Sequence, residues 1–273
     1  MTVDVEDYFQ VSAFADSIDR SDWDALPCRV ERNTNRVLDM FAEGGARATF
    51  FTLGWVAERY PALVRRIADE GHEVASHGMA HFRVGSQTPA EFAADVRRTR
   101  ALLQDVSGQP VLGYRAASFS IGADTLWAHA VLADAGHRYS SSVYPVRHDH
   151  YGLPDAPRFA YAAGTADAGI VELPLTTVRF RERNLPCAGG GYFRLLPYRY
   201  FRWAIGRVNG TDGQPAIFYF HPWEIDPGQP RQQGIGAKTR FRHYVNLNRM
   251  APRLTRMLKD FRWDRMDAVF RIS

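Results

Sequence analysis

The sequence predicts an α/β domain built as a closed or nearly closed (β/α) barrel of about seven strand–helix units. Two observations support this fold. The chain has 273 residues, enough for one such domain or two smaller ones. Short β-rich runs alternate with amphipathic helical stretches, which is typical of parallel strands joined by right-handed crossovers. A doubly wound open sheet is the alternative, and both folds bind ligands at the carboxyl ends of their strands.

The expected strands are short runs of β-branched, aromatic and other apolar residues between polar or glycine-containing turns. In chain order they are residues 2–5, 48–53, 73–76, 111–115, 170–173, 216–220 and 268–270.

Helices are expected where apolar residues recur every three or four positions. They cover residues 36–41, 56–67, 92–106 and 126–131, a stretch after Pro197, and residues 244–261. The third of these begins after Thr88-Pro89 and ends at Gly108, which are typical start and stop residues. Residues 140–195 are less regular and rich in Gly, Pro and Tyr. We interpret residues 1–273 as a single domain in which this region is an insertion.

Composition excludes several classes of protein. The net charge of +4, from 34 basic and 30 acidic residues, is mild, and no basic patch typical of nucleic-acid binding occurs. Two cysteines far apart argue against a disulfide scaffold or a cysteine zinc site. No apolar run reaches the length of a membrane span, and the first residues show no signal-peptide pattern. We therefore expect a cytoplasmic protein, with peripheral association to a membrane as an alternative.

The most informative stretch is the segment from Ala75 to His81, which follows an expected strand. If the chain turns helically after Ser76, His77 and His81 lie on one face, about one turn apart. Two imidazoles in that arrangement can bind one divalent cation. The alternative is that they are two unrelated polar residues at a turn.

Three carboxylates, Asp4, Glu6 and Asp7, stand at the end of the first expected strand. Anions so close repel one another unless a cation or basic group neutralises them. One of them would complete a site of two histidines and one carboxylate, a set that suits catalytic Zn²⁺ or Co²⁺. Another could act as a general base. A solvated acidic turn is the alternative.

Two further polar residues end expected strands. Arg115 could pair with a free carboxylate, or form an ordinary surface ion pair. His221 follows the most apolar strand and is a candidate general acid, with a structural core histidine as the alternative. The three glycines at 189–191 lack the context of a phosphate loop, and we expect their backbone to approach another surface closely.

Six motifs in this order resemble those of polysaccharide deacetylases of the NodB-homology type, carbohydrate esterase family 4. More narrowly, the chain resembles the branch associated with exopolysaccharide loci in bacteria with PEP-CTERM sorting systems. The matching stretches are Thr2–Val11, Ser76–His81, Gly113–Ser120, Tyr139–Ser142, Gly189–Phe193 and Tyr219–Glu224.

The resemblance implies a distorted (β/α) barrel and metal-dependent removal of acetyl groups from an N-acetylated sugar. Asp4 would be the base and His221 the acid. Arg115 would orient Asp4, and the backbone N–H of Ser118 would face the oxyanion. His77 would be a metal ligand, and His81 with it.

The chain departs from the family pattern at three places. Val5 follows Asp4 where the family commonly has a second aspartate, so the carboxylate ligand is Glu6 or Asp7. Strand alternation puts Glu6 on the side of Asp4 and favours it. Ala116 and Ala117 replace a common proline. Ser140 stands where related chains often have an aspartate that supports the acid histidine, which leaves the support of His221 open.

The expected function is a hydrolase that removes acetyl groups from N-acetylated residues of a bacterial exopolysaccharide, with one Zn²⁺, or Co²⁺ or Ni²⁺ in its place. Tyr192, Phe193 and Trp223 could line a groove for sugar rings, or pack in the core, and the insertion at 140–195 would face the substrate. Two alternatives remain: a metal-independent ring-amide hydrolase like the allantoinase branch, and a non-catalytic carbohydrate-binding assembly protein. The sequence does not name the polymer, decide between N- and O-acetyl groups, or indicate the oligomeric state.

Overall fold

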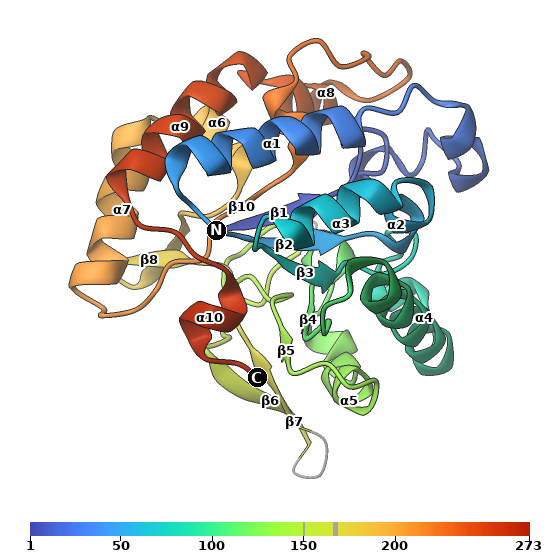
Figure 1. The fold of residues 1–273 in the computed structure, drawn as a ribbon. Helices are drawn as coiled ribbons and strands as arrows, with labels where there is room; N and C mark the ends of the chain where they lie inside the picture. The colour runs from blue at the N-terminus through green and yellow to red at the C-terminus, as the bar shows by residue number, and fades with distance from the viewer. Residues whose placement is uncertain (150, 166–168) are drawn as a thin grey trace.

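A curled, largely parallel sheet forms the centre of the molecule (Figure 1). The coordinates are a computed structural model that describes residues 1–149, 151–165 and 169–273. The eight strands lie in the order β10-β1-β2-β3-β4-β5-β7-β6, and only β6 runs antiparallel to its neighbour. Their bounds are β1 Thr2–Val5, β2 Thr49–Thr52, β3 Glu73–Ser76, β4 Gly113–Tyr114, β5 Tyr139–Ser140, β6 Tyr161–Gly164, β7 Gly169–Glu172 and β10 Tyr219–Phe220.

The expected α/β barrel is confirmed in a distorted, open form. Over the described residues, the edge strands β10 and β6 do not pair with each other, so the sheet is a half-barrel. A separate hairpin joins β8, Thr177–Phe180, to β9, Arg183–Pro186. Residues 140–195 are therefore more regular than expected, because besides the expected strand, which forms β7, they supply β6 of the main sheet and this hairpin.

The helices surround the sheet (Figure 1). In chain order they are α1 Val30–Gly44, α2 Gly54–Arg59, α3 Pro61–Asp69, α4 Pro89–Ser107, α5 Ala128–Asp134, α6 Gly190–Leu195, α7 Tyr198–Gly210, α8 Ala237–Tyr244, α9 Met250–Asp260 and α10 Met266–Phe270. None of these described helices is both long and apolar enough to cross a membrane.

Helix α4 has the ends that its sequence predicts. The Thr88 hydroxyl accepts a hydrogen bond from the backbone N–H of Glu91, and the Glu91 carboxylate accepts one from the backbone N–H of Thr88. This capping box satisfies backbone donors at the helix start. Gly108 ends the helix with φ +66°, a left-handed conformation that suits glycine.

Three expected elements differ in the structure. Residues 56–67 form two helices, because Tyr60 leaves the helical conformation directly before Pro61. Residues 244–261 are likewise interrupted after α8, where Asn246 takes φ +51°.

The third difference concerns residues 268–270, which were expected as a strand but belong to helix α10. The backbone N–H of Met266 donates to the Thr49 hydroxyl, and the N–H of Asp267 donates to the Glu73 carboxylate. These side chains at the start of β2 and β3 bind the first turn of the helix. A three-residue apolar run is too short to indicate which of the two structures forms.

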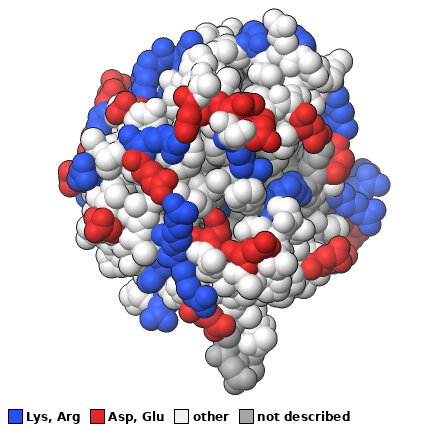
Figure 2. Space-filling model, turned by 90° about the vertical axis from the view of Figure 1, so that its right-hand side faces the viewer, with Lys and Arg blue, Asp and Glu red and all other residues white. Residues whose placement is uncertain are grey.

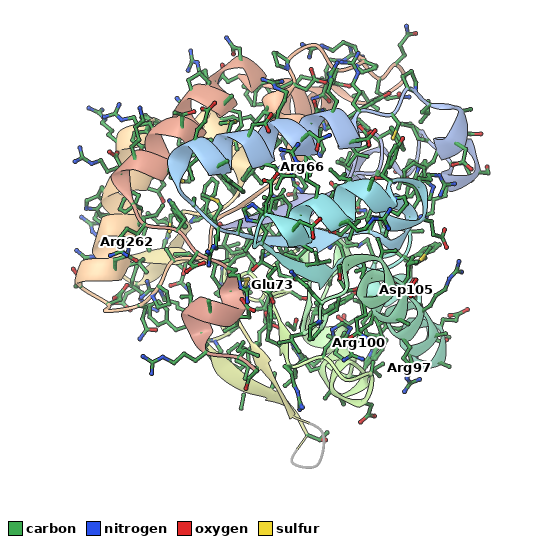
Figure 3. The ribbon with its side chains drawn as sticks, in the orientation of Figure 1. Arg66, Glu73, Arg97, Arg100, Asp105 and Arg262 are labelled. Atoms are coloured by element: carbon green, nitrogen blue, oxygen red, sulfur yellow. The ribbon has the colours of Figure 1, made fainter. Side chains whose placement is uncertain are left out.

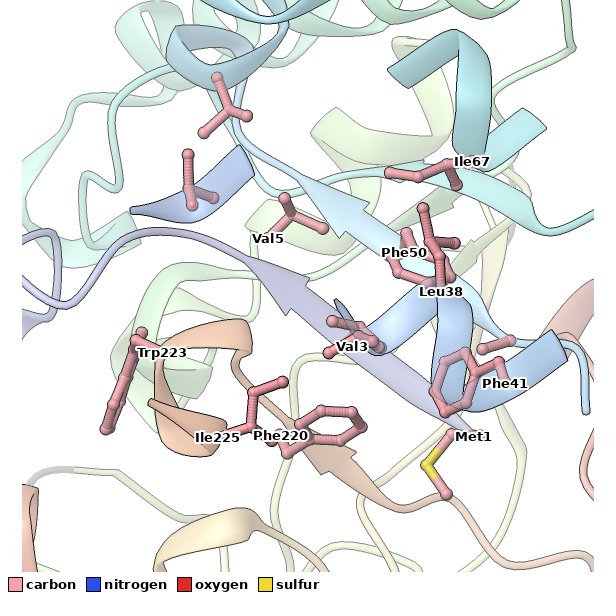
Figure 4. Packing of buried hydrophobic residues seen from close by; sticks show 14 of the residues in the cluster. Met1, Val3, Val5, Leu38, Phe41, Phe50, Ile67, Phe220, Trp223 and Ile225 are labelled. Atoms are coloured by element: carbon pink, nitrogen blue, oxygen red, sulfur yellow. The ribbon is translucent and has the colours of Figure 1, made fainter. Parts of the chain in front are cut away.

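The side chains of β1 point alternately to the two faces of the sheet, so its valines and its aspartate lie on opposite sides. Val3 and Val5 pack with Leu38 and Phe41 of α1 and with Phe50 of β2 on the helix-covered side of the sheet (Figure 4). Successive side chains of a strand point to opposite faces, so Asp4 points to the other side. The packing of β1 against α1 thus determines which way its acidic residue faces.

Charged residues of both signs are mixed on the surface. Figure 2 shows one face on which basic and acidic side chains are interspersed, with a short run of basic ones left of its centre. This view agrees with the mild net charge of the chain.

Candidate metal and acid–base centre

The candidate site lies at the carboxyl edge of the sheet, where several polar residues follow neighbouring strands. Glu6 follows β1, His77 follows β3, Arg115 follows β4 and His221 follows β10. Because β10, β1, β2, β3 and β4 are parallel neighbours, their carboxyl ends meet at one edge. The sheet therefore brings Glu6, near the start of the chain, together with His221, in its last quarter.

Glu6, His77 and His81 form a compact cluster with the composition of a metal site. One ligand atom from each lies within 4.8 Å of the other two. The Glu6 Oε2 atom lies 2.9 Å from His81 Nε2 and 3.9 Å from His77 Nε2. All three side chains are buried. Among the described residues, this is the group of His, Cys, Asp and Glu that could hold an ion.

The donor atoms of this cluster fit a divalent cation. Glu6 Oε2 is buried and forms no hydrogen bond of ordinary geometry with any described residue, which is costly unless another partner is present. His77 Nδ1 lies 2.8 Å from the carbonyl oxygen of Arg115. That contact orients the ring and leaves Nε2 to face the cluster, as is typical of metal-binding histidines.

The charges also suit a metal. Burial lowers the pKa of His77 to about 4, so this imidazole is neutral near pH 7. Burial raises the pKa of Glu6, but the facing His81 and His221 outweigh it and lower this pKa to about 2. A neutral imidazole and an ionised carboxylate are the forms that bind metal.

The expected helical turn from His77 to His81 is wrong. The described residues 77–83 form no helix, and Gly78 and His81 have φ of +75° and +54°. The Gly78 and Met79 carbonyls instead accept hydrogen bonds from the first two N–H groups of α2. The two imidazoles come together through a bend, with ring centroids 5.2 Å apart.

Asp7 lies away from the cluster and binds the start of α1. Its Oδ2 atom accepts hydrogen bonds from the N–H groups of Arg29 and Val30, at 2.5 and 2.8 Å. A carboxylate there accepts hydrogen bonds from backbone N–H groups that have no partner within the helix. The positive end of the helix dipole also stabilises its negative charge. The geometry therefore favours Glu6 over Asp7 as the carboxylate ligand.

Asp4 and Arg115 form a buried ion pair beside the cluster. Arg115 Nη1 donates to Asp4 Oδ1 at 2.6 Å and to the Thr2 hydroxyl at 2.8 Å. Arg115 also donates to the carbonyl and hydroxyl oxygens of Ser141. The second oxygen of Asp4, Oδ2, lies 3.9 Å from His221 Nε2.

His221 is one-fifth exposed and faces the carboxylates. Its Nε2 lies 3.5 Å from Glu6 Oε1, and its Nδ1 lies 3.1 Å from Glu224 Oε2. Burial lowers the pKa of His221, but the negative charges of Glu6 and Glu224 outweigh it and raise this pKa to about 9. The imidazole is therefore placed to carry a proton at the edge of the site.

Sequence reasoning missed two charged residues behind His221. Glu224 Oε1 accepts from Arg194 Nε at 2.9 Å, and both side chains are buried. Glu224 stands three residues after His221 in the Tyr219–Glu224 motif, and this spacing was the available signal. Arg194 gave no signal, because its position depends on how α6 packs against the segment after β10.

The three aromatic residues expected to line a sugar groove have different surroundings. Phe193 is fully buried and packs edge-on against Phe201 and Phe218, so its expected place in the groove is wrong. Trp223 is almost buried and stacks between His221 and another imidazole. Tyr192 is only half-buried and remains available to a ligand.

A pocket of about 460 Å³ opens beside His221. Tyr192, Tyr151 and the edge of Trp223 contribute to its wall, together with the exposed ring of Phe241. A pocket with aromatic walls next to a few polar groups is typical of a ligand site.

Ser118 lies beyond β4 in a short turn with φ +52°. Its hydroxyl donates to the Ser12 hydroxyl at 2.7 Å, which ties the turn to the segment after β1. The role of its backbone N–H toward an oxyanion stays a prediction.

Comparison with known proteins identifies two family regions in the chain. Residues 21–140 match the family model described as polysaccharide deacetylase. Residues 141–271 match a domain of unknown function (DUF3473).

Sequence relatives agree with the first match. A chitooligosaccharide deacetylase of Bradyrhizobium sp. (strain ANU 289) is 31% identical over 111 residues, which are 41% of this chain and 48% of the relative. A peptidoglycan-N-acetylglucosamine deacetylase of Bacillus cereus is 33% identical over 75 residues, 28% of this chain and 27% of the relative. The chain thus spans at most about half the length of these curated relatives.

Solved structures share the fold. A putative polysaccharide deacetylase from Mycobacterium smegmatis has a TM-score of 0.62 at 20% identity, covering 98% of this chain and 87% of that one. Puue allantoinase has a TM-score of 0.58 at 15% identity, covering 88% and 71%. Taken together, residues 21–140 are similar in sequence to polysaccharide deacetylases, and the fold of the chain is similar to that of these solved structures.

Proposed function

We propose that this protein is a metal-dependent hydrolase that removes acetyl groups from N-acetylated sugar residues of a bacterial polysaccharide. The observation that carries the proposal is the cluster of Glu6, His77 and His81, whose ligand atoms lie within 4.8 Å of one another. The buried pair of Asp4 and Arg115 and the imidazole of His221 stand directly beside it.

Glu6, His77 and His81 would hold the cation through one oxygen and two nitrogens. This set suits Zn²⁺, with Co²⁺ and Ni²⁺ as alternatives. When bound, such an ion acidifies water and polarises a carbonyl group. Asp7 has no part in this site, because its carboxylate is occupied by backbone N–H groups of α1.

Asp4 is proposed as the general base. Arg115 donates a hydrogen bond to Oδ1 of this carboxylate, while Oδ2 faces His221 and would accept a proton from water. His221 is the proposed general acid, and its Nε2 would donate a proton to the leaving amine. The backbone N–H of Ser118 is the proposed donor to the oxyanion.

The proposed substrate is an N-acetylated polymer whose sugar rings lie in the pocket beside His221. Aromatic walls from Tyr192 and Tyr151 suit the apolar faces of pyranose rings. Relatives of this chain are named for chitooligosaccharide and for peptidoglycan N-acetylglucosamine. The six sequence motifs favour an exopolysaccharide of the kind associated with PEP-CTERM loci as the natural polymer.

The ring-amide alternative is less well supported. The likeness to an allantoinase concerns the fold alone. A metal-independent enzyme has no need for the buried Glu6 and the two histidines that converge on it. A non-catalytic carbohydrate-binding role would likewise leave the Asp4–Arg115 pair and His221 without a chemical purpose.

Acetate release from N-acetylglucosamine oligomers tests the proposal. We expect release by the purified protein, its loss after treatment with a chelator, and its recovery when Zn²⁺ is added back. The variant His77→Ala should bind no metal and release no acetate. Chelator-insensitive release, or full activity in His77→Ala, would contradict the metal-dependent function.

A further inference from the structure

The imidazole of His221 is held from behind by a carboxylate of its own segment. Glu224 Oε2 lies 3.1 Å from His221 Nδ1 and also accepts the backbone N–H of His221 at 3.0 Å. The two residues are three apart in a short helical turn that begins at Pro222. One carboxylate oxygen thus contacts both the ring and the backbone of the same histidine.

The other oxygen of Glu224 is held by Arg194. Arg194 Nε donates to Glu224 Oε1 at 2.9 Å, and its remaining donors bind the backbone carbonyls of Arg242, His243 and Val245. Both Arg194 and Glu224 are about 1% exposed. Each donor nitrogen of the guanidinium therefore has an acceptor, and the guanidinium cannot turn away without breaking several buried bonds.

A glycine makes room for this carboxylate. A Cβ atom added to Gly190 would lie 2.0 Å from Glu224 Oε2, far inside contact distance. The predicted close approach of the glycine motif thus occurs, and its partner is the Glu224 side chain. A larger residue at this position would push the carboxylate away from His221.

We propose that Glu224 and Arg194 are positioning residues for His221 in the deacetylation reaction. The carboxylate accepts the Nδ1–H of the ring, so the other nitrogen, Nε2, points to Asp4 and Glu6 and carries the transferable proton. Arg194 in turn holds the carboxylate in place. This inference rests on the proposed function, because it assigns His221 the role of acid.

As the general acid, His221 transfers one proton to the leaving amine. As the C–N bond of the acetamide breaks, the electron pair stays on nitrogen and the Nε2 proton of His221 moves to it, so a neutral amine leaves. The oxygen of water has by then joined the acetyl carbon, and its proton has passed to Asp4. Acetic acid and the amine are the products, and the acid then loses its proton to solvent. The proton that Asp4 took from water returns to His221, so both residues regain their starting forms.

Residues 141–271, the domain of unknown function, also gain a role in the reaction. Arg194, Glu224 and His221 all lie within residues 141–271, whereas His77 and His81 lie within the deacetylase match at 21–140. Strand β10 of the later region pairs directly with β1. We therefore assign the acid half of the site to residues 141–271 and the ligand histidines to residues 21–140.

Leaving-group dependence tests this role. An amine leaves only when protonated, whereas an activated phenolate leaves from p-nitrophenyl acetate without a proton. For Glu224→Gln we expect kcat on N-acetylglucosamine oligomers to fall about 10- to 100-fold, within the contribution of a general acid. KM and the rate on p-nitrophenyl acetate should stay close to those of the unmodified protein.

Gly190→Ala gives a second route if Glu224→Gln does not fold. It keeps both charges and displaces the carboxylate, so the amide rate should fall more than the ester rate. Asp226→Asn is the matched control. Asp226 is a buried carboxylate of the same segment, paired with Arg29 and Arg32 away from the site. It should lower thermal stability and leave the ratio of amide to ester rates unchanged.

A third readout is independent of turnover. Nitrogen-15 spectra of labelled histidine should show His221 with a proton on Nδ1, and Glu224→Gln or Gly190→Ala should change that signal. Equal losses on both substrates, or an unchanged ratio with an unchanged His221 signal, would overturn the positioning role. If the unmodified protein hydrolyses only the ester, the proposed function fails instead, and the His221 signal still decides the contact with Glu224.

Discussion

Arg115 Nη1 lies 2.6 Å from Asp4 Oδ1, and the two side chains are 0% and 3% exposed. The pair joins β1 to the end of β4 across the interior of the half-barrel, and the guanidinium lies over the ring of Phe51 with 4.0 Å between their centres. A buried ion pair of this kind leaves an uncompensated charge if either partner is removed.

Arg115→Met should therefore destabilise the protein by about 3–5 kcal/mol, the usual cost of breaking a buried pair. Arg115→Lys keeps the charge but loses the fork of donors, and we expect it to fold with lower kcat. Thermal unfolding and acetate release measure the two effects. An Arg115→Lys variant with unaltered kcat would contradict the orienting role of this residue.

The roles of Glu6 and Asp7 can be distinguished by measuring how much metal a variant of each residue binds. Glu6→Gln should fold and lose bound metal, since it removes the negative charge of the ligand and replaces one carboxylate oxygen by an NH2 group. Asp7→Asn should retain metal and lose about 1 kcal/mol of stability, because the start of α1 is less well capped. Elemental analysis and thermal unfolding of both variants test this. Metal loss from Asp7→Asn with metal retained in Glu6→Gln would reverse the assignment.

Tyr192 and Phe193 are neighbours in sequence with opposite surroundings. Phe193→Ala should lose about 3–5 kcal/mol of stability, the range for a large ring removed from a core. Tyr192→Ala should unfold near the temperature of the unmodified protein, with a raised KM for oligosaccharides. The two measurements are thermal unfolding and the dependence of acetate release on substrate concentration. A stable Phe193→Ala with a raised KM would restore Phe193 to the groove.

Glu73 makes stability depend on pH. It lies buried in the interior beside α10 (Figure 3), and burial raises its pKa from 4.5 to about 7. Between pH 4.5 and about pH 7, the Glu73 carboxyl is protonated in the folded protein and ionised in the unfolded chain. The contribution of Glu73 to stability is therefore present at low pH and is lost as pH rises from about 4.5 through 7.

Glu73→Gln removes this titration. Its melting temperature, relative to that of the unmodified protein, should rise between about pH 4.5 and pH 7 and then level off, by about 2–4 °C for each kcal/mol. Changed hydrogen bonds to Thr49 or Tyr139 would cost stability by an amount that does not vary with pH. That cost would shift the difference in melting temperature between the two proteins without changing how this difference depends on pH. A difference that does not vary with pH would show that Glu73 is not protonated in the folded protein.

Sequence alone predicted the repeated strand–helix pattern and the residues at the strand ends. Parallel strands place their carboxyl ends at one edge, so Asp4, His77, Arg115 and His221 could be grouped before any coordinates were known. Helix caps were equally predictable, since Thr88 and Gly108 act on backbone groups only a few residues away. These signals are local or follow from a general rule of topology.

Tertiary structure decided the rest. Asp7 caps α1 because the chain after β1 returns to that helix, and Phe193 is buried because α6 packs on α7 and the segment before β10. His81 reaches the cluster through a bend with positive φ, not through helical spacing. Arg194 meets Glu224 across 30 residues of chain. Such contacts depend on how whole elements pack, and no periodicity or spacing in one sequence records that.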